Sequence, residues 1–185
     1  MINLSKILEE IEEEEIEIQV ENYKIFCDMD GVLVDFNKRF EQFSGMSPNE
    51  YRKVKGEEYG EKKAMQMFWH LIDGEVGVRF WVGMPWMPGG EELWNYIKPY
   101  NPTLLSSPSA NEASRMGKRL WVRNNIPGTK LILASHNNKQ KQAAPNHILI
   151  DDYYKNTSQW KTAGGIAIPF KSTPQTISDL KKLGL

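Results

Sequence analysis

Five short apolar segments alternate along the chain with longer segments of helical periodicity, and this alternation restricts the fold more than any other feature. The segments with the character of buried strands are 24–27, 103–105, 130–134, 147–150 and 165–168. Strands separated by helices predict right-handed crossovers, and therefore a mostly parallel sheet with helices on both faces. We expect an α/β protein.

A mainly helical stretch of about fifty residues separates the first of these strands from the second. Phenylalanines recur at helical spacing over 36–43, a capping box with proline at the first helical position occupies 47–50, and 60–73 carries a third helical pattern. Residues 74–88, rich in Gly, Pro, Trp and Met, predict an irregular segment. We expect residues 36–85 to form a helical cap inserted over one end of the sheet.

Helical patterns continue after this insertion. They cover about 89–98, the segment from a second capping box at 109–112 to about Asn124, the region around Trp160, and the residues after Pro174. The expected organisation is an acidic N-terminal extension (1–22), a core (23–35 and 86–185) and a cap (36–85).

Charge and composition argue against several classes of protein. The 185 residues carry 23 basic and 24 acidic side chains, without the basic excess typical of a dedicated duplex-binding protein. Cys27 has no second cysteine to pair with, no apolar run is long enough to span a bilayer, and residues 9–17 carry seven glutamates where a secretory signal is apolar. We expect a cytoplasmic protein with neither a membrane nor a nucleic-acid partner, as a monomer or a homodimer.

Acidic and hydroxyl side chains directly follow three of the predicted strands. Ligands of open parallel sheets bind at the carboxyl ends of the strands. The candidates at these positions are Asp28 and Asp30, Ser106 and Ser107, and Asp151 and Asp152, with Lys139 and Lys141 preceding the last pair. Four acids, two hydroxyl groups and a cation form a constellation that predicts a site.

The four carboxylates suit a divalent cation. Asp28 and Asp30 point to the same side of an extended segment, and Gly31 permits a sharp turn after them. Carboxylates from two strands repel unless a cation lies between them, and all-oxygen ligation with few protein groups suits Mg²⁺. Taken alone, the first pair also fits a hairpin turn and Asp151-Asp152 a helix cap. The presence of both pairs favours a metal site.

The order of these residues resembles that of the haloacid-dehalogenase-like (HAD) phosphatases. The strand ending in Asp28-Met29-Asp30-Gly31 resembles their first motif, Leu104-Leu105-Ser106-Ser107-Pro108 their second, and Asp151-Asp152 their fourth. More narrowly, DMDGVLVDF, the Ser-Ser-Pro ending and Ile-Leu-Ile-Asp-Asp are similar to the 5'(3')-deoxyribonucleotidase family. The resemblance implies a Rossmann-like core with a small helical cap after the first motif.

The resemblance also implies roles for the site residues. Asp28 is the nucleophile that forms an aspartyl-phosphate, and Asp30 is the general acid and base. Mg²⁺ is held by Asp28, the Asp30 carbonyl and Asp152, with Asp151 oriented nearby. Ser106 and a lysine hold the phosphoryl oxygens. The family spacing of ten residues before Asp151 selects Lys141 over Lys139, with Lys118 and Arg119 as weaker alternatives.

The expected substrate is a small phosphomonoester, specifically a nucleoside monophosphate. Aromatic side chains are abundant in the predicted cap, and a nucleobase stacks well on such rings. Packing explains aromatic residues at helical spacing equally well, but Phe80 and Trp81 fall in the predicted irregular segment. We therefore expect Phe80, Trp81, Phe36 and Ser107 to bind substrate.

Three other functions compete with this interpretation. A phosphatase of the same chemistry can act on polynucleotide 3'-phosphate ends or small sugar phosphates, and the basic cluster over 115–123 is the one hint of an approach path for DNA. A non-catalytic Mg²⁺ or nucleotide-binding module is disfavoured because every acid that the mechanism needs is present. An interaction protein would instead use the acidic N-terminus.

Overall fold

The computed structural model describes residues 22–185, and these form a single parallel sheet with helices on both faces. The strands are β1 (Lys24–Cys27), β2 (Thr103–Ser106), β3 (Leu131–Leu133), β4 (His147–Asp151) and β5 (Ile166–Pro169), in the order β3-β2-β1-β4-β5. All four pairings are parallel. The predicted α/β class is confirmed, and the predicted extension over 1–22 lies outside the described residues except for Asn22.

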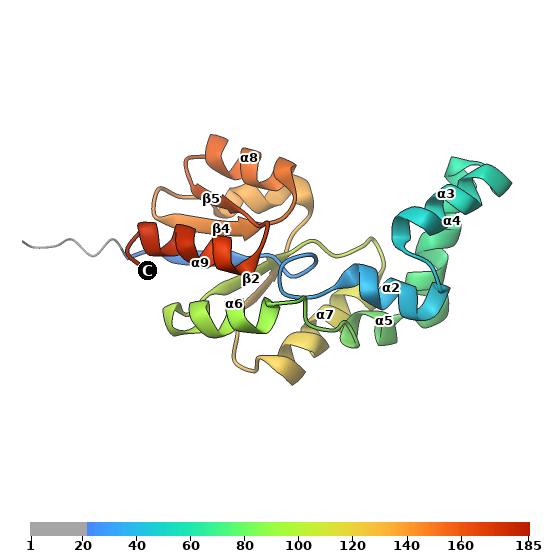
Figure 1. Ribbon diagram of the computed structural model, residues 1–185, viewed down its shortest axis with the longest axis horizontal. Coiled ribbons are helices and arrows are strands. Elements are labelled where there is room, and N and C mark those ends of the chain that lie inside the picture. Colours follow the sequence, from blue (N-terminus) through green and yellow to red (C-terminus); the bar gives the residue numbers. More distant parts are fainter. Residues whose placement is uncertain (1–21) are drawn as a thin grey trace, which may run out of the picture.

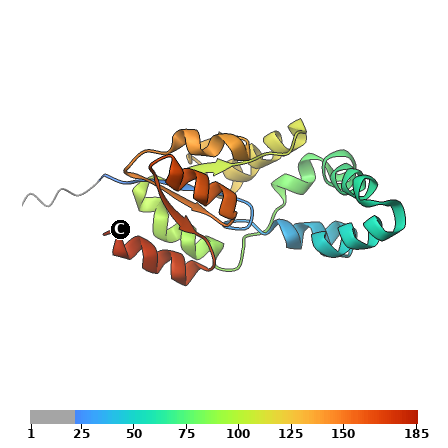
Figure 2. The same cartoon turned by 90° about the horizontal axis from the view of Figure 1, so that it is seen from above.

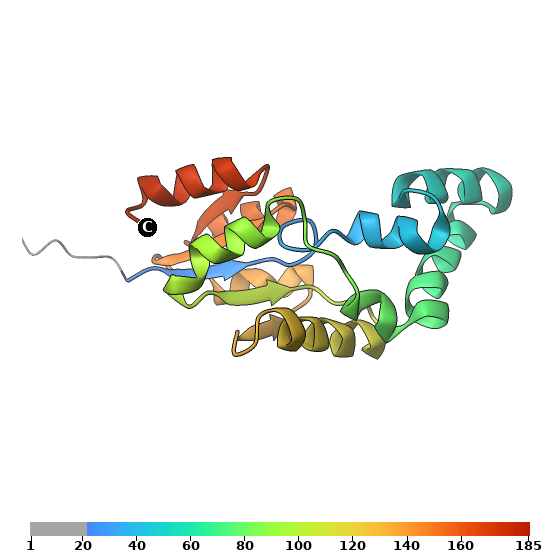
Figure 3. The ribbon, with the colours of Figure 1, turned by 60° about the horizontal axis from the view of Figure 1, so that its bottom comes forward.

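Side chains alternate between the two faces of the sheet and fill two separate hydrophobic clusters. On one face, Ile25 and Cys27 pack in the larger cluster, which receives residues of α6 (Gly90–Ile97), α7 (Glu112–Asn125) and α9 (Thr173–Lys182). On the other face, Phe26 packs with Leu149 and with Trp160 of α8 (Tyr154–Thr162). Figures 1 and 3 show α8 on the side of the sheet opposite to α6 and α9.

The remaining helices form a group that we call the helical lobe, residues 36–82. It contains α2 (Phe36–Ser44), α3 (Pro48–Tyr59), α4 (Glu61–Trp69), the π-helix η1 (His70–Val76) and α5 (Val78–Val82). In all three views α2, α3 and α4 lie at the end of the molecule opposite the C-terminus (Figure 2). The chain enters and leaves the lobe side by side, because the Asp35 amide donates to the Pro85 carbonyl at 2.9 Å and Val34 forms a bridge with Trp86.

Two short 3-10 helices complete the described fold, η2 (Lys98–Tyr100) before β2 and η3 (His136–Gln142) between β3 and β4. Within residues 22–185, no helix is both long and apolar enough to cross a membrane.

One of the two predicted capping boxes has its N-cap serine where expected. Ser47 accepts a hydrogen bond from the Glu50 amide at the start of α3. The second prediction is wrong by two residues, since α7 begins at Glu112 and its N-cap is Asn111, which accepts from the Ala113 amide at 2.9 Å. Ser109 instead accepts from the Asn111 amide, so the serine orders the turn that precedes the cap.

The prediction of an irregular segment over 74–88 is wrong for its first half. The π-helix η1 continues to Val76, and α5 occupies Val78–Val82 after Gly77, whose φ is +60°. Phe80 and Trp81 are buried, and α5 packs closely on α7. Tertiary burial of this aromatic pair therefore overrides the glycine signals that flank it.

The contact between α5 and α7 depends on a helical glycine. A Cβ atom on Gly117 would lie 2.3 Å from the Cβ of Trp81, which is too close for any side chain. We expect Gly117→Ala to lower the free energy of unfolding by about 1–3 kcal/mol, the usual cost of overpacking. Gly56→Ala in α3 is the matched control, because nothing lies within 4 Å of its Cβ position. It should raise stability by about 0.4–1 kcal/mol. Urea unfolding compares the two, and equal effects would contradict the close packing.

Candidate active site

The register of the sheet brings the predicted acids together. Cys27 of β1 pairs with Ile150 of β4, so the residues that follow, Asp28 and Asp151, lie side by side at the carboxyl edge. Carboxylate oxygens of Asp28, Asp151 and Asp152 all lie within 4.8 Å of one another. Three carboxylates at this spacing can hold a divalent cation through oxygen ligands alone.

A buried lysine lies between two of these acids, and it is Lys139. Its ammonium is 3.0 Å from Asp28 Oδ2 and 2.7 Å from Asp151 Oδ2, and the side chain is 1% exposed. Burial lowers the pKa of Lys139, but the two carboxylates outweigh burial and raise it above its ordinary value. Lys139 therefore remains a cation in the site.

The predicted lysine, Lys141, is not at the site. It is exposed, and it lies two residues beyond Lys139 in η3. A 3-10 helix has three residues per turn, so side chains two positions apart point in different directions. The family spacing of ten residues therefore selects the wrong lysine here, because the turn of η3 directs Lys139 inward.

Hydrogen bonds from Asn156 and Tyr153 hold the Asp151 carboxylate in addition to its ion pair with Lys139. The amide group of buried Asn156 donates to both carboxylate oxygens at 3.0 Å, and the Tyr153 backbone amide donates to Oδ1 at 2.9 Å. Burial and the neighbouring Asp28 raise the pKa of Asp151. These contacts, together with the ion pair to Lys139, fix the position of the Asp151 carboxylate next to Asp152.

Unlike Asp28 and Asp151, Asp152 forms no ion pair with Lys139 that would offset the neighbouring negative charges. Asp152 as a residue is exposed, but its carboxylate lies within the acidic cluster, where partial desolvation and the charges of Asp28 and Asp151 raise its pKa to about 7. The carboxylate lies directly against Gly31, where a Cβ atom would be 2.3 Å from Oδ2, and Gly31 adopts φ +77°. The glycine predicted to permit a turn thus also makes room for the Asp152 carboxylate.

Asp28 and Asp30 meet different partners. Asp28 Oδ1 accepts from the Met29 amide at 2.8 Å and Oδ2 faces Lys139. Asp30 Oδ2 accepts from Lys118 at 2.6 Å, and the same ammonium donates to Ser106 Oγ at 3.0 Å. The sequence indicates Lys118 only as a weaker alternative to Lys141 for the phosphate-binding lysine. In the structure Lys118 lies beside Asp30.

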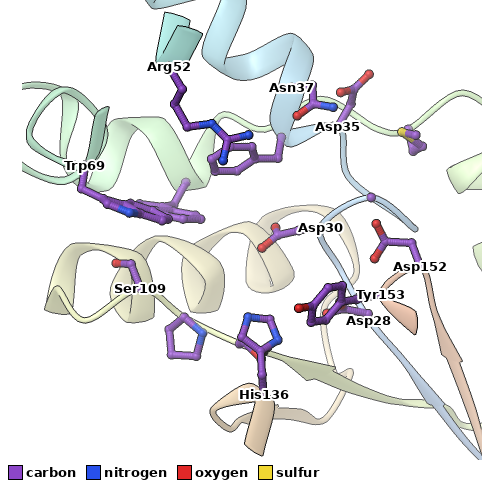
Figure 4. Close-up of a pocket in the computed structure, with 16 residues that line it drawn as sticks. Asp28, Asp30, Asp35, Asn37, Arg52, Trp69, Ser109, His136, Asp152 and Tyr153 are labelled. Atoms are coloured by element: carbon purple, nitrogen blue, oxygen red, sulfur yellow. Dashed lines mark hydrogen bonds between the residues drawn. The ribbon is translucent and has the colours of Figure 1, made fainter. Parts of the chain in front are cut away.

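A cavity of about 620 Å³ opens above these acids (Figure 4). Arg52 and Trp69 enter it from the helical lobe, and Asp30, Asp152 and Tyr153 from the side of the sheet. The volume falls within the usual range for small-molecule sites. The cavity therefore has a carboxylate floor and a roof that contains aromatic rings and one guanidinium group.

Three of the four predicted substrate-binding residues line this cavity, namely Phe36, Trp81 and Ser107. Phe80 does not, because it is fully buried and its ring packs against Phe36 and Trp81 at centroid distances of 5.2 Å. Ser106 is also fully buried, beneath the cavity beside Lys118.

Several cavity-lining residues are not among the site residues selected from the sequence: Asp35, Asn37, Arg52, Trp69, His136 and Tyr153. His136 contacts two of its neighbours, with Nδ1 3.3 Å from Ser107 Oγ and the ring edge-on to Tyr153. Trp69 and Arg52 lie on two different helices of the lobe, and only the folding of α3 against α4 brings both to the cavity.

Comparison with solved structures identifies the fold. L-2-haloacid dehalogenase from Xanthobacter autotrophicus is similar with a TM-score of 0.51 and 11% sequence identity, over 86% of this chain and 82% of the dehalogenase. A hydrolase from Streptococcus pneumoniae TIGR4 gives a TM-score of 0.49 at 13% identity, over 87% of this chain and 97% of the hydrolase. A HAD family hydrolase from Deinococcus radiodurans R1, with bound phosphate and sodium, gives 0.45 at 12% identity, over 87% of each chain.

The chain thus has the HAD-like fold that the dehalogenase also has. No protein-family model matches the sequence, and no curated protein matches it either. A shared fold does not fix the reaction, so the function has to be inferred from the residues of the site.

Proposed function

We propose that this protein is a Mg²⁺-dependent phosphomonoesterase that hydrolyses nucleoside monophosphates through an aspartyl-phosphate on Asp28. The observation that carries the proposal is the cluster of Asp28, Asp151 and Asp152 beside buried Lys139, at a cavity that Asp28, Asp30 and Asp152 line. The resemblance to HAD phosphatases in three separate sequence motifs supports the same chemistry.

The donor set fits a magnesium ion. Three carboxylates share a small volume, and Lys139 pairs with Asp28 and Asp151 but forms no ion pair with Asp152. The raised pKa of Asp152 is what an acidic cluster short of one cation should have. Asp28, Asp152 and the Asp30 carbonyl would hold the ion, and Mg²⁺ bound there would neutralise charge on the phosphoryl oxygens of the substrate.

The protein groups then divide the reaction into two displacements. A carboxylate oxygen of Asp28 attacks phosphorus, the bond from phosphorus to the ester oxygen breaks, and Asp30 donates its proton to that oxygen. In the second step Asp30 takes a proton from water as the water oxygen attacks phosphorus, which releases inorganic phosphate and restores the Asp28 carboxylate. Lys139 lies against Asp28, where its charge stabilises the phosphoryl oxygens in both steps.

Asp30 favours phosphoryl transfer over dehalogenation. The resemblance implies that dehalogenases of this superfamily lack an acid two residues after the nucleophile, and this chain has one. Dehalogenation displaces a halide, which needs no proton, whereas an alkoxide leaving group does. The presence of Asp30 beside the cavity therefore argues for an ester oxygen as the leaving atom.

The roof of the cavity favours a nucleoside as the leaving group. Phe36, Trp69 and Trp81 present aromatic rings, and Arg52 is the one lysine or arginine that lines this cavity in residues 22–185. Aromatic rings stack on a nucleobase with about 1–3 kcal/mol each. A sugar phosphate would leave these rings without a partner.

A phosphate-release screen tests the proposal. The substrates are deoxy- and ribonucleoside 5'- and 3'-monophosphates, small sugar phosphates and a 3'-phosphorylated oligonucleotide, each with Mg²⁺ and with a chelator. We expect the highest kcat/KM on mononucleotides and no turnover with chelator. Preference for sugar phosphates or oligonucleotide ends would overturn the nucleotidase assignment. Halide release from a 2-haloacid without phosphate release from any ester would overturn the phosphatase assignment.

The acidic cluster also predicts a pH dependence of metal binding. Asp152 has a pKa of about 7 against an ordinary value of 3.8, so without metal it holds a proton between these pH values in the folded state. A metal ion has to displace that proton, so affinity for Mg²⁺ should rise as pH increases from 6 to 8. Thermal unfolding should therefore show a larger increase in Tm on adding Mg²⁺ at pH 8 than at pH 6.

The same raised pKa also determines how the stability of the folded state depends on pH when no metal is bound. Between about 4 and 7 the folded state binds more protons than the unfolded chain at Asp152, so stability contributed by this group falls as pH rises. Asp152→Asn removes the titrating group and should abolish both the Mg²⁺-dependent shift and this loss. A shift in Tm that is equal at both pH values would contradict the assignment of Asp152 as a ligand.

A further inference from the structure

Lys118 occupies a position on α7 where the helical pattern calls for an apolar side chain. The buried residues of α7 are Ser114, Gly117, Lys118, Trp121 and Val122, which form one continuous stripe at helical spacing. The side chain of Lys118 is fully buried. A buried ammonium is costly unless it is paired and hydrogen-bonded, so this lysine requires specific partners.

Its ammonium meets three elements of the fold. It donates to Asp30 Oδ2 at 2.6 Å and to Ser106 Oγ at 3.0 Å, and it lies 5.1 Å from the ring centroid of Trp81. These residues come from the turn after β1, the end of β2, and α5 of the helical lobe. An ammonium has three N–H donors and the face of an indole ring attracts cations, so the three contacts satisfy the group.

The contact with Lys118 leaves the two oxygens of Asp30 in different environments. Oδ2 is fixed by the ammonium, while Oδ1 is shielded from solvent and has no hydrogen-bond partner among the described residues. Asp30 itself lines the cavity. Buried carboxylate oxygens without a partner are rare in folded proteins, and one at the floor of a cavity suits a group that gives a proton to a bound acceptor and takes one from a bound water.

We propose that Lys118 is a positioning residue that holds Asp30 by Oδ2 so that Oδ1 is available to the leaving-group oxygen. The inference rests on the proposed function, because it assigns Asp30 the transfer of a proton to that oxygen. Lys118 acts through Asp30 and has no contact of its own with the cavity.

Trp81 extends this arrangement into the helical lobe. Its indole Nε1 donates to Asp73 Oδ1 of η1 at 3.0 Å, and its Cβ lies close to the backbone of Gly117. Asp73, Trp81, Lys118 and Asp30 therefore form a continuous chain of contacts from the lobe to the proposed acid. The lobe that supplies the roof of the cavity thus also holds the lysine against Asp30.

The test compares two leaving groups that differ in their need for a proton. A nucleoside 5'-monophosphate leaves as an alkoxide and needs proton transfer, whereas p-nitrophenyl phosphate leaves as a stabilised phenolate and does not. We expect Lys118→Met to lower kcat on the nucleotide by about 10²-fold or more, the usual contribution of a general acid. The kcat on p-nitrophenyl phosphate should fall less than about tenfold, and KM for the nucleotide should change little because Lys118 does not line the cavity.

Asp30→Asn is the comparison variant and should show the same dependence on the leaving group. The double variant should be no slower on the nucleotide than Asp30→Asn alone, because both changes remove the same function, proton transfer by Asp30. Retained turnover of p-nitrophenyl phosphate shows that Lys118→Met is folded. If that variant does not fold, Lys118→Gln keeps an N–H donor at the position and takes its place.

Two results would overturn the inference. Equal losses on both substrates would assign Lys118 to phosphoryl binding through Ser106, and unchanged rates on both would make it structural only. Failure of the proposed function itself is distinguishable, because the parent protein would then release no phosphate from the nucleotide.

Discussion

Asp28→Asn is expected to abolish phosphate release, with a loss in kcat of at least about 10³-fold, as is usual when a nucleophile is removed. The asparagine has nearly the same shape but no carboxylate oxygen that can bond to phosphorus. Asp28 is well placed for this role because its side chain is 9% exposed and one oxygen is held by the Met29 amide. Phosphate release from a nucleoside monophosphate with Mg²⁺ measures the effect.

Asp35→Asn is the matched control for this variant. Asp35 lines the same cavity, but its carboxylate caps α2 by accepting from the Lys38 amide at 2.8 Å. Asparagine caps helices about as well as aspartate, so the control should keep the fold and lose far less of the rate than Asp28→Asn. A parental rate for Asp28→Asn would remove Asp28 from the nucleophile role, and an equal loss in both variants would make the effect non-specific.

Lys139→Met should give the second large effect, on both stability and rate. Removing the ammonium leaves the buried carboxylates of Asp28 and Asp151 without their shared cation. Breaking a buried ion pair from one side costs about 3–5 kcal/mol, so urea unfolding without Mg²⁺ should show a loss of this size. Phosphate release with Mg²⁺ should fall as well, because the positive charge beside the attacked phosphorus is lost.

Lys141→Met distinguishes the two lysines of η3. Lys141 is exposed, and an exposed substitution of this kind usually changes stability by less than about 0.5 kcal/mol. We expect parental stability and a parental rate. The reverse pattern, in which Lys141→Met is inactive and Lys139→Met is not, would restore the lysine selected by the family spacing and contradict the observed geometry.

The sequence predicts the strands and the acids of the site for the same reason. Burial of β1 and β4 on both faces produces continuous apolar runs, and the acids mark the points where those runs end. Because the strands are parallel, their carboxyl ends share one edge of the sheet. That Asp28 and Asp151 lie at the same edge therefore follows from local patterns, whereas their contact depends on the pairing of β1 with β4.

The lysines are harder to predict because their positions depend on tertiary structure. Whether Lys139 or Lys141 points inward is decided by the turn of η3, which no periodic pattern in 136–142 indicates. Lys118 does leave a signal, since it falls within the apolar stripe between Gly117 and Trp121 on α7. A lysine at such a position is a candidate for a buried ion pair, and its partner becomes known only from the fold.

The aromatic residues of the lobe illustrate a further limit. Phe80 and Trp81 are adjacent in sequence and equally apolar, yet only Trp81 reaches the cavity. The difference arises from the short helix α5, which turns consecutive side chains about 100° apart. Residues on separate helices, such as Arg52 and Trp69, share the cavity only after the lobe has folded.

Identifying the residue that becomes phosphorylated during turnover tests directly whether Asp28 is the nucleophile. The protein is mixed with a nucleoside monophosphate and Mg²⁺, quenched in acid within a single turnover, and its peptides are sequenced by mass spectrometry. Our account predicts a phosphoryl group on Asp28, absent when Mg²⁺ is chelated. Turnover that leaves Asp28 unmodified, or that places the phosphoryl group on another residue, would contradict it.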